Sequence, residues 1–497
     1  MATSQPPLRF TSHKHLAHRL VLATLTGRAV HISQIRSSSP TNPGLAPYEI
    51  SFLRLLEAVT NGSHIEISYT GTILVYKPGL ITGSAPGSGA SGGVIKHELP
   101  AGCTRGISYF LIPVCLLAPF SKASFNILFT GPGVITSSTP TGDMSVDSVR
   151  TAILPLFSQF GIFNNIELRV LRRSNPDRNG KGGGGEVQLI FGHQVRLPKT
   201  LHLLNPGRIK SVRGVAYSTG VSGSNNARMI EVARGVLNPL VSDIYIFSDV
   251  SSAPLVPAPE KNNPNAKRKI GIGFGLSLVA ESSTGCLYSA DVASPPSGGQ
   301  PPEDIGKQCA YQLLESISVG GCVSMAGAPT VLSLMAMGSE DVGRLQVGRD
   351  IISHEAIVQL ARDLSQFGAA GWGVRDAPEE NKSGDVIEML GGRLRDPIRI
   401  TKKLAIFFNR HRAGSSMRGT NPRHRHLNFA LSFAKGLPNF VVNGLSVHSI
   451  VGIKIGVLAP IVSGTIITNI STSYNVRPRD LENITFRFPY PFRVDVT

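Results

Sequence analysis

Two adjacent residues, Arg362 and Asp363, are of types that could take part in acid–base chemistry at a phosphodiester. A carboxylate can remove the proton from a ribose 2′-hydroxyl, and a guanidinium can stabilise the charge of a phosphorane. No histidine stands beside the pair to complete such a site. Because adjacent Arg and Asp are also common on helix surfaces, an exposed or partner-facing pair is the alternative interpretation.

Two glycine-rich segments have compositions that could contact phosphate. Residues 87–92 (GSGASG) have the spacing GxGxxG, but no strand and helix clearly flank them, so we expect a flexible loop. Residues 179–185 (NGKGGGG) lack the GK[ST] ending of a phosphate-binding loop. Their consecutive N–H groups could still form an anion-binding nest, and a tight turn between two strands is the alternative.

Cysteine and histidine do not form a metal-binding pattern. The five cysteines, at positions 103, 115, 286, 309 and 322, include no CxxC pair. His424 and His426 are too isolated from other ligand types to indicate zinc. We therefore expect no metal, no cofactor and a reducing compartment.

Positive charge is concentrated towards the end of the chain. The 497 residues carry a formal charge of +17, and residues 391–497 contain 16 basic and 4 acidic residues, a net of +12. We expect 391–497 to be an atypical, poorly ordered basic extension and assign it no function. Its apolar stretch Ile450–Ile470 has about the length of a membrane span, but Lys454 and Pro460 interrupt it, so we expect no membrane partner.

A second, shorter basic segment lies inside the chain, at Lys267–Lys269, after a loop rich in Pro and Asn. It fits a nuclear import signal, a contact with RNA, or a solvated turn. The sequence alone does not choose among these, although a charged turn is the commonest of the three.

The elements that must position these residues repeat the order helix, strand, strand. Apolar residues at i, i+3, i+4 and i+7 or related spacings predict amphipathic helices, and alternation predicts strands. Four copies are expected, with helices at 47–60, 145–160, 303–317 and 354–367. Strands are expected at 65–69, 73–75, 166–172, 186–191, 372–375 and 385–389. Pro155 should kink its helix.

A different segment separates the second copy from the third. It is expected to contain a helix at 223–237 and strands at 243–248 and 271–280. The predicted organisation is therefore an α+β body, 16–191 and 291–390, with a smaller α/β domain inserted at 192–290 and the basic extension at 391–497.

Several motifs of the body resemble one protein family, the RNA 3′-terminal phosphate cyclase superfamily, and within it the cyclase-like branch of eukaryotic ribosome assembly. The resemblance covers about residues 16–390. The motifs that carry it are 20–28 (LVLATLTGR), 35–37 (IRS), 42–45 (NPGL), 48–56 (YEISFLRLL), 59–63 (VTNGS), 65–72 (IEISYTGT), 183–187 (GGGEV), 214–218 (GVAYS) and 338–345 (GSEDVGRL). It implies the cyclase fold of repeated helix-plus-sheet units with one inserted domain.

The resemblance also implies a site, from which this chain departs. Cyclases use an imidazole that attacks the α-phosphate of ATP and holds AMP covalently. That residue is expected near the start of the 354–367 helix, but 351–357 (IISHEAI) do not match the motif, and the best register falls on Glu355 or Ala356. His354 is therefore a candidate nucleophile, with an exposed residue at the helix start as the alternative.

Two arginines complete the candidate set that the resemblance implies. Arg19 takes the place of a phosphate-contacting arginine, without the glycines that accompany it in cyclases. Arg36 is followed by Ser37 where cyclases usually present a second arginine. Arg19 and Arg36 are expected to form a remnant anion- or RNA-binding pocket. The cyclase-like branch tends to carry an Arg-Asp pair at Arg362–Asp363, which has been suspected of RNA cleavage.

The resemblance implies a non-catalytic assembly factor of the small-subunit processome, located in the nucleus and nucleolus and needed for maturation of 18S rRNA. Its expected partners are a nucleolar ribosome-assembly GTPase, pre-rRNA and snoRNP. The alternative is an RNA-processing enzyme, either a pre-rRNA endonuclease or an ATP-dependent RNA 3′-phosphate cyclase.

Overall fold

The computed structural model describes residues 6–394 apart from 86–92, 164, 194–196, 258–266, 339–341, 371, 378–385 and 392. Beyond them it describes two short strands, β23 (Ile453–Val457) and β24 (Thr468–Thr472), which pair antiparallel. The GSGASG segment and most of the basic extension thus lie outside the described residues. Within the described residues no helix is long and apolar enough to cross a membrane.

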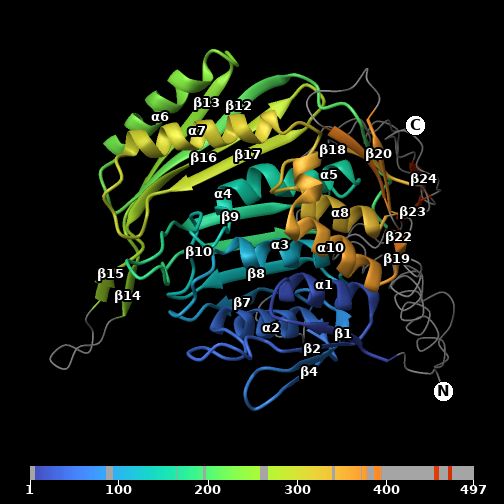
Figure 1. Cartoon of the computed structure of the whole chain (residues 1–497). Coiled ribbons are helices and arrows are strands. Elements are labelled where there is room, and N and C mark those ends of the chain that lie inside the picture. Colours follow the sequence, from blue (N-terminus) through green and yellow to red (C-terminus); the bar gives the residue numbers. More distant parts are fainter. Residues whose placement is uncertain are drawn as a thin grey trace. The chain divides into compact units, whose positions relative to one another are not determined.

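Three four-stranded sheets with the same topology form the body of the molecule. In Figure 1 the first is blue, the second is cyan to green, and the third is orange apart from its strand at 202–203. Each sheet begins with a parallel pair of strands and continues with two antiparallel neighbours. The strand orders are β1-β2-β5-β4, β7-β8-β10-β9 and β11-β18-β21-β20. Each body unit therefore follows the chain order strand, helix, strand, helix, strand, strand.

The elements of the first unit are β1 (Leu8–Thr11), α1 (Leu16–Thr26), β2 (Val30–Ser33), α2 (Pro47–Val59), β4 (His64–Ile67) and β5 (Leu74–Lys77). Those of the second unit are β7 (Ile95–Glu98), α3 (Ser108–Leu117), β8 (Phe125–Thr130), α4 (Val146–Ser148), a π-helical turn (Val149–Ile153), α5 (Leu154–Gln159), β9 (Glu167–Arg172) and β10 (Glu186–Phe191). Those of the third unit are β11 (His202–Leu203), α8 (Ala328–Ala336), β18 (Arg344–Gly348), α9 (Arg349–Ser353), α10 (Glu355–Gln366), β20 (Gly373–Asp376) and β21 (Val386–Leu390).

Smaller elements connect these units. They are the strand pairs β3 (Thr60–Asn61) with β6 (Leu80–Ile81) and β19 (Ala369–Ala370) with β22 (Arg393–Leu394), and the 3₁₀ turn Ala118–Phe120.

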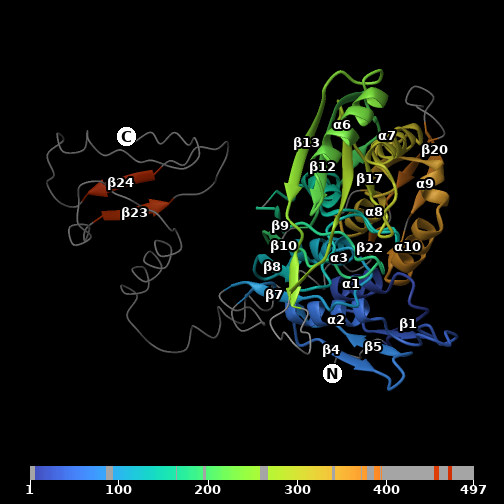
Figure 2. The same ribbon diagram turned by 90° about the vertical axis from the view of Figure 1, so that its left-hand side faces the viewer.

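The inserted domain is a fourth sheet, ordered β13-β12-β16-β17, that lies at the top of Figure 1. Its elements are β12 (Ile209–Thr219), α6 (Ser224–Leu237), β13 (Ile244–Ser251), β14 (Leu255–Pro257), β15 (Lys267–Lys269), β16 (Gly273–Ser282), β17 (Leu287–Ala293) and α7 (Pro302–Ser318). Helices α6 and α7 pack against each other and against this sheet (Figure 2).

The α+β class and the repeated units with one insertion are confirmed, with one correction to the count. The described residues contain three body units rather than four, because α7, which we expected to begin a third copy, packs on the insert. The insert therefore has elements from 209 to 318, whereas we expected 192–290. A helix with one apolar stripe shows in the sequence that it is half-buried, but the sequence does not show which sheet it covers.

Local sequence explains where the helices begin and bend. Helix α2 starts at Pro47, and Glu49 accepts a hydrogen bond of 2.8 Å from the N–H of Ala46, which satisfies one free donor of the first turn. Pro155 lies just after the π-helical turn, where the hydrogen bonding has already loosened to i→i+5. The predicted distortion at Pro155 is therefore present as a widened turn.

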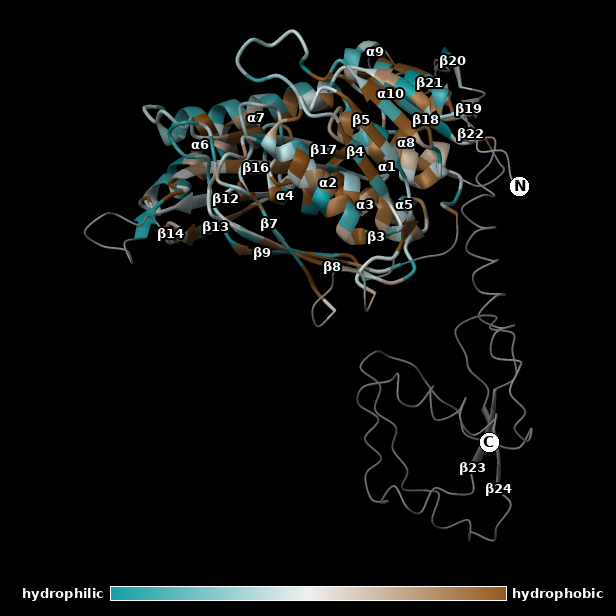
Figure 3. Cartoon of the chain, turned by 90° about the horizontal axis from the view of Figure 1, so that it is seen from below, coloured by the Kyte–Doolittle hydropathy of each residue, from teal (hydrophilic) through white to brown (hydrophobic). Residues whose placement is uncertain are grey.

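Helices from the three body units meet at the centre of the molecule. Helix α1 contacts α3, α3 contacts α8, and α8 contacts α10. Large side chains fill this region, including Phe52, Phe110 and Phe129, each fully buried. In Figure 3, α6 and α7 carry both brown and teal residues, as expected for helices with one face towards solvent. The central helices thus fix the first and third units against each other.

Candidate functional site at the junction of the first and third units

The structure pairs two of the candidate residues, Arg19 and Asp363, although 344 positions separate them. Arg19 lies on α1 and Asp363 on α10. The Nε atom of Arg19 is 2.8 Å from Oδ2 of Asp363, and an Nη atom is 3.3 Å from Oδ1. Both side chains are buried, with 6% and 1% of their surface exposed. The result is a bidentate ion pair across the junction of the first and third units.

The surroundings of this pair satisfy its remaining polar atoms. Arg19 donates a third bond, of 3.1 Å, to the carbonyl of Thr11, and Gln359 donates one of 2.8 Å to Asp363. The guanidinium lies 4.7 Å from the ring centre of Phe10, which in turn stacks on Phe367. A buried charge is stable only when it is paired and hydrogen-bonded, and both conditions are met here.

Histidines beside the pair add little positive charge at neutral pH. Burial lowers the pKa of His15, which lies near Asp363 and Arg19. Burial also lowers the pKa of His13, whose charged neighbours are Arg36 and Glu49 rather than this pair. Burial also lowers the pKa of His18 to about 4. The Nε2 atom of His18 is enclosed without a hydrogen-bond partner. The buried pair itself is therefore neutral overall, and His18 adds no positive charge to it at neutral pH.

His354 lies at the first residue before α10 and is exposed. Its Nδ1 atom accepts a hydrogen bond of 3.2 Å from the N–H of Ala356, so the imidazole caps the helix. It precedes Asp363 by nine residues, which is about 13 Å along a helix axis at 1.5 Å per residue. This geometry fits the alternative interpretation of His354, an exposed residue at the helix start.

Arg36 occupies a separate place within the first unit. Its guanidinium forms two bonds of 2.7 Å with Glu49, one of 2.8 Å with the carbonyl of Gly44 and one of 2.9 Å with the hydroxyl of Tyr48. Glu49 is the same residue that caps α2. Hydrogen bonding with Glu49 raises the pKa of Arg36. Arg36 and Arg19 therefore share no carboxylate, and each is paired with one of its own.

Arg362 and the glycine-rich loop complete the set of sequence candidates. Arg362 is exposed while its neighbour Asp363 is buried, because consecutive helix residues face different directions. In the loop, the N–H groups of Gly182, Gly183 and Gly185 donate to the carbonyls of Cys103, Pro132 and Val134. The loop therefore fits the tight connection between two strands, since the donors that a nest would need are already bonded.

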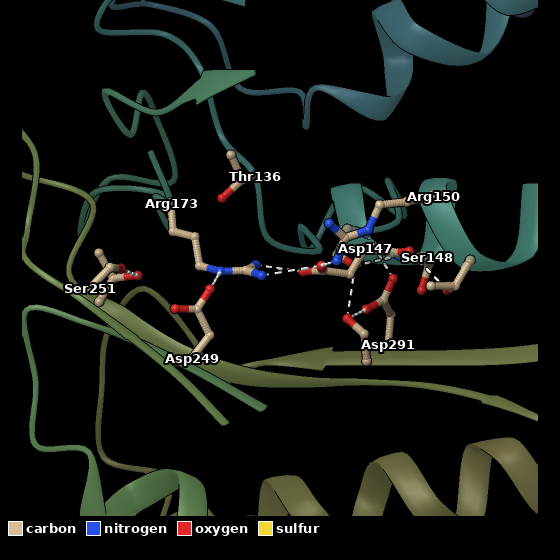
Figure 4. A network of polar contacts seen from close by, with 12 residues as sticks. Thr136, Asp147, Ser148, Arg150, Arg173, Asp249, Ser251 and Asp291 are labelled. Carbon is tan, nitrogen blue, oxygen red and sulfur yellow. Dashed lines mark hydrogen bonds and ion pairs between the residues drawn. The ribbon is translucent and has the colours of Figure 1, made fainter. Parts of the chain in front are cut away.

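Sequence reasoning missed the polar network that joins the second unit to the insert (Figure 4). Arg173, after β9, lies 2.5 Å from Asp147 of α4 and 2.5 Å from Asp249 of β13. Arg150 also contacts Asp147, at 3.0 Å. Asp291 of β17 accepts a bond of 2.7 Å from the N–H of Ser145, and burial raises the pKa of its carboxyl. Isolated charged residues in the sequence gave no sign of these partners.

A family model assigns the insert to a known class. Residues 204–318 match the insert domain of RNA 3′-terminal phosphate cyclase. The match includes β12, α6, β13, β16, β17 and α7, which the structure places in one sheet with two helices.

Full-length relatives extend this assignment to the body. The RNA 3′-terminal phosphate cyclase-like protein of Mus musculus is 40% identical over 396 residues, 78% of this chain and 96% of the relative. The rRNA processing protein rcl1 of Schizosaccharomyces pombe is 40% identical over 357 residues, 72% of this chain and 88% of the relative. The rRNA processing protein RCL1 of Saccharomyces cerevisiae is 38% identical over 369 residues, which cover 74% of this chain and 90% of the relative. The chain belongs to the RNA 3′-terminal phosphate cyclase-like family.

Proposed function

We propose that this protein acts in rRNA processing as a non-catalytic assembly factor of the nucleolar small-subunit processome, needed for maturation of 18S rRNA. It works by binding, and its partners are a ribosome-assembly GTPase and pre-rRNA with its snoRNP. Two relatives are named as rRNA processing proteins, which supports the process. The site geometry supports binding rather than catalysis.

One observation carries the proposal, the buried bidentate pair of Arg19 and Asp363. An arginine that binds the phosphates of a substrate must be free to exchange its partner. Here the exchange would break two hydrogen bonds to a carboxylate that is 1% exposed and leave that carboxylate charged inside the protein. Breaking a buried pair on one side costs about 3–5 kcal/mol. The arginine is thus suited to holding two units together.

The cyclase reaction needs an imidazole nitrogen directed at the α-phosphate of ATP, close to arginines that stabilise the phosphates. His354 uses Nδ1 to cap α10 and precedes Asp363 by more than two turns along that helix. The endonuclease reaction needs a carboxylate within hydrogen-bond reach of a ribose 2′-hydroxyl. Asp363 is enclosed by Arg19 and Gln359.

Two experiments test the proposal. In the first, the purified chain is incubated with ATP labelled at the α-phosphate and resolved under denaturing conditions. We expect no covalent AMP; an adduct that disappears in His354→Ala would overturn the non-catalytic assignment. In the second, the tagged chain is isolated from cells and its RNA is sequenced. We expect pre-18S rRNA, and a chain that never associates with such particles contradicts the role in assembly.

A further inference from the structure

Strand β13 (Ile244–Ser251) forms an open edge of the insert sheet. It is the outermost strand in the order β13-β12-β16-β17, and Figure 2 shows it to the left of β12. Among the described elements, β12 and α6 are the two that contact it closely. Strand β12 lies along one edge of β13, so the opposite edge has no strand partner within the part of the chain that the structure describes.

The hydrogen bonds to β12 show which backbone groups of β13 face outwards. The two strands are parallel, with Val212 in register with Ile244, and the N–H of Val212 donates to the carbonyl of Asp243 at 2.9 Å. Successive residues of a paired strand alternate between bonding to the neighbouring strand and facing away from it. The N–H and C=O groups that face away belong to Ile244, Ile246, Ser248 and Val250. Within the described residues, no backbone group of another element bonds to them.

Two aromatic side chains are exposed on the face of β13 that α6 leaves uncovered. Tyr245 and Phe247 are 53% and 60% exposed, and their ring centres lie 5.4 Å apart in an edge-to-face arrangement. The opposite face belongs to the helix, because Ile246 is buried and Ser248 accepts a bond of 3.0 Å from the side chain of Asn226 on α6. A strand added at the open edge would place every second side chain beside the two rings.

Strand β13 lacks the features that protect other edge strands of this molecule. Folded proteins keep edge strands short, or place charges, Pro or bulges on them. Strands β1, β4, β7 and β20 have four residues each, and β9 carries Glu167, Arg169 and Arg172. Strand β13 has eight residues, no Pro or Lys, an unbroken register with β12, and one charged side chain, Asp249, which pairs with Arg173. Its edge is therefore open to pairing with another strand.

We propose that the open edge of β13 binds an extended segment of a partner protein, which adds a fifth strand to the insert sheet. The outward N–H and C=O groups recur at every second residue, about 7 Å apart, and an extended polypeptide has donors and acceptors at the same repeat. Single-stranded RNA can stack on the aromatic rings but leaves this backbone ladder unpaired. The segment has apolar side chains at alternate positions, which pack on Tyr245 and Phe247, and no Pro where its N–H donates to β13.

The test begins with a phage-displayed library of random peptides of about twelve residues, selected on the full chain. The enriched peptides are synthesised with a fluorescein label, and their binding to the unmodified chain is measured by anisotropy. We expect apolar and polar residues to alternate over about seven positions without Pro. No enrichment, or apolar residues at helical spacing, overturns the proposal.

A substitution at Ser248 tests the backbone contact. Ser248→Pro removes an N–H that faces away from β12, so the bonds within the sheet remain. Ser248→Ala removes the same hydroxyl but keeps the N–H. We expect Ser248→Pro to bind the enriched peptides at least about tenfold more weakly, and Ser248→Ala to bind within about threefold of the unmodified chain. Equal binding by the two variants overturns the proposal.

A change in the peptide keeps the test independent of how well the proline variant folds. Circular dichroism and thermal melting check the folding of each variant. An enriched peptide is then N-methylated at every second residue, in each of the two possible sets. One set should abolish binding and the other should leave most of it, because alternate N–H groups of the peptide face β13. If both sets bind alike, main-chain pairing is excluded.

The aromatic rings are tested by the double variant Tyr245→Ala with Phe247→Ala. We expect it to bind the enriched peptides about tenfold more weakly, because the alternate apolar side chains lose their contact surface. The matched control is Tyr69→Ala with Tyr311→Ala, two exposed aromatic residues on other elements, and should bind within about threefold of the unmodified chain. Equal losses in the two double variants contradict a site at β13.

Two other occupants of this edge give different results. A second copy of this chain gives a dimer in light scattering that Ser248→Pro dissociates, and RNA gives displacement of the bound peptide by a single-stranded RNA of about 20 nucleotides. Either result overturns the assignment. The inference rests on strand geometry and not on the role in rRNA processing. A chain that binds the peptides through β13 but never associates with pre-18S rRNA particles refutes that role alone.

Discussion

Two cation-containing regions of this molecule differ in their exposure and in their partners. At the junction of the first and third units, Arg19 is buried and bonded on both sides by Asp363. On β15, Lys267 and Lys269 are exposed, and among the described residues neither has a carboxylate within 4.0 Å. The difference teaches that the partner and the exposure of a cation, rather than its residue type, decide whether its charge is available to another molecule.

The largest expected effect comes from breaking the buried pair. Asp363→Ala should lower the free energy of unfolding by about 3–5 kcal/mol, because Arg19 is left charged and unpaired inside the protein. The double variant Arg19→Met with Asp363→Leu should recover most of that loss. Urea denaturation of the full chain measures both. If Asp363→Ala were as stable as the unmodified chain, the pair would not hold the units together.

The polar network of Figure 4 provides a comparison within one cluster. Asp147 is 1% exposed and Asp249 is 45% exposed, although both contact Arg173. Asp147→Ala should therefore cost about 2–4 kcal/mol, and Asp249→Ala about 1 kcal/mol or less, because water screens the exposed pair. Thermal melting of the two variants side by side gives the order, and equal losses would contradict the burial argument.

The stability of the chain should fall in acid because some histidines are buried in the neutral form. Burial lowers the pKa of His97 to about 4, and the nearby charge of Arg54 makes a smaller contribution in the same direction. The unfolded chain binds this proton near pH 6.5, so stability is lost as the pH falls from 6.5 towards 4, by at most about 1.4 kcal/mol per pH unit.

His97→Gln removes that titration and keeps a polar partner for Ser51, which lies 2.9 Å from Nε2 of His97. We expect a shallower dependence of the melting temperature on pH between 6.5 and 4. His64→Gln, at an exposed histidine, is the control and should leave the slope unchanged. If the melting temperature depended on pH with the same slope in the unmodified chain, His97→Gln and His64→Gln, His97 would not contribute to the loss of stability in acid.

The smallest expected effect concerns His354. His354→Ala removes the cap of α10 and should cost about 0.5–1 kcal/mol, whereas His354→Asp should keep the cap and most of the stability. Chemical denaturation distinguishes the two variants. A loss larger than that of Asp363→Ala would show that His354 has contacts beyond the cap.

Much of the fold followed from periodicity. The helix expected at 223–237 is α6 (Ser224–Leu237), and the strands expected at 166–172 and 186–191 are β9 (Glu167–Arg172) and β10 (Glu186–Phe191). These elements have one face towards the core and one towards solvent. The central helix α3 (Ser108–Leu117) gave no such pattern, because nearly all its residues are buried and apolar.

The sequence by itself determined the family motifs, the amphipathic elements and the candidate residues, because each depends on residues close together in the chain. Only the tertiary structure decided that Arg19 meets Asp363, that Arg36 meets Glu49, and that α7 covers the insert. The residues next to a charged side chain on a helix can be the same whether its partner in the folded protein is a carboxylate or a phosphate. Which of the two it meets depends on packing between segments that are hundreds of residues apart.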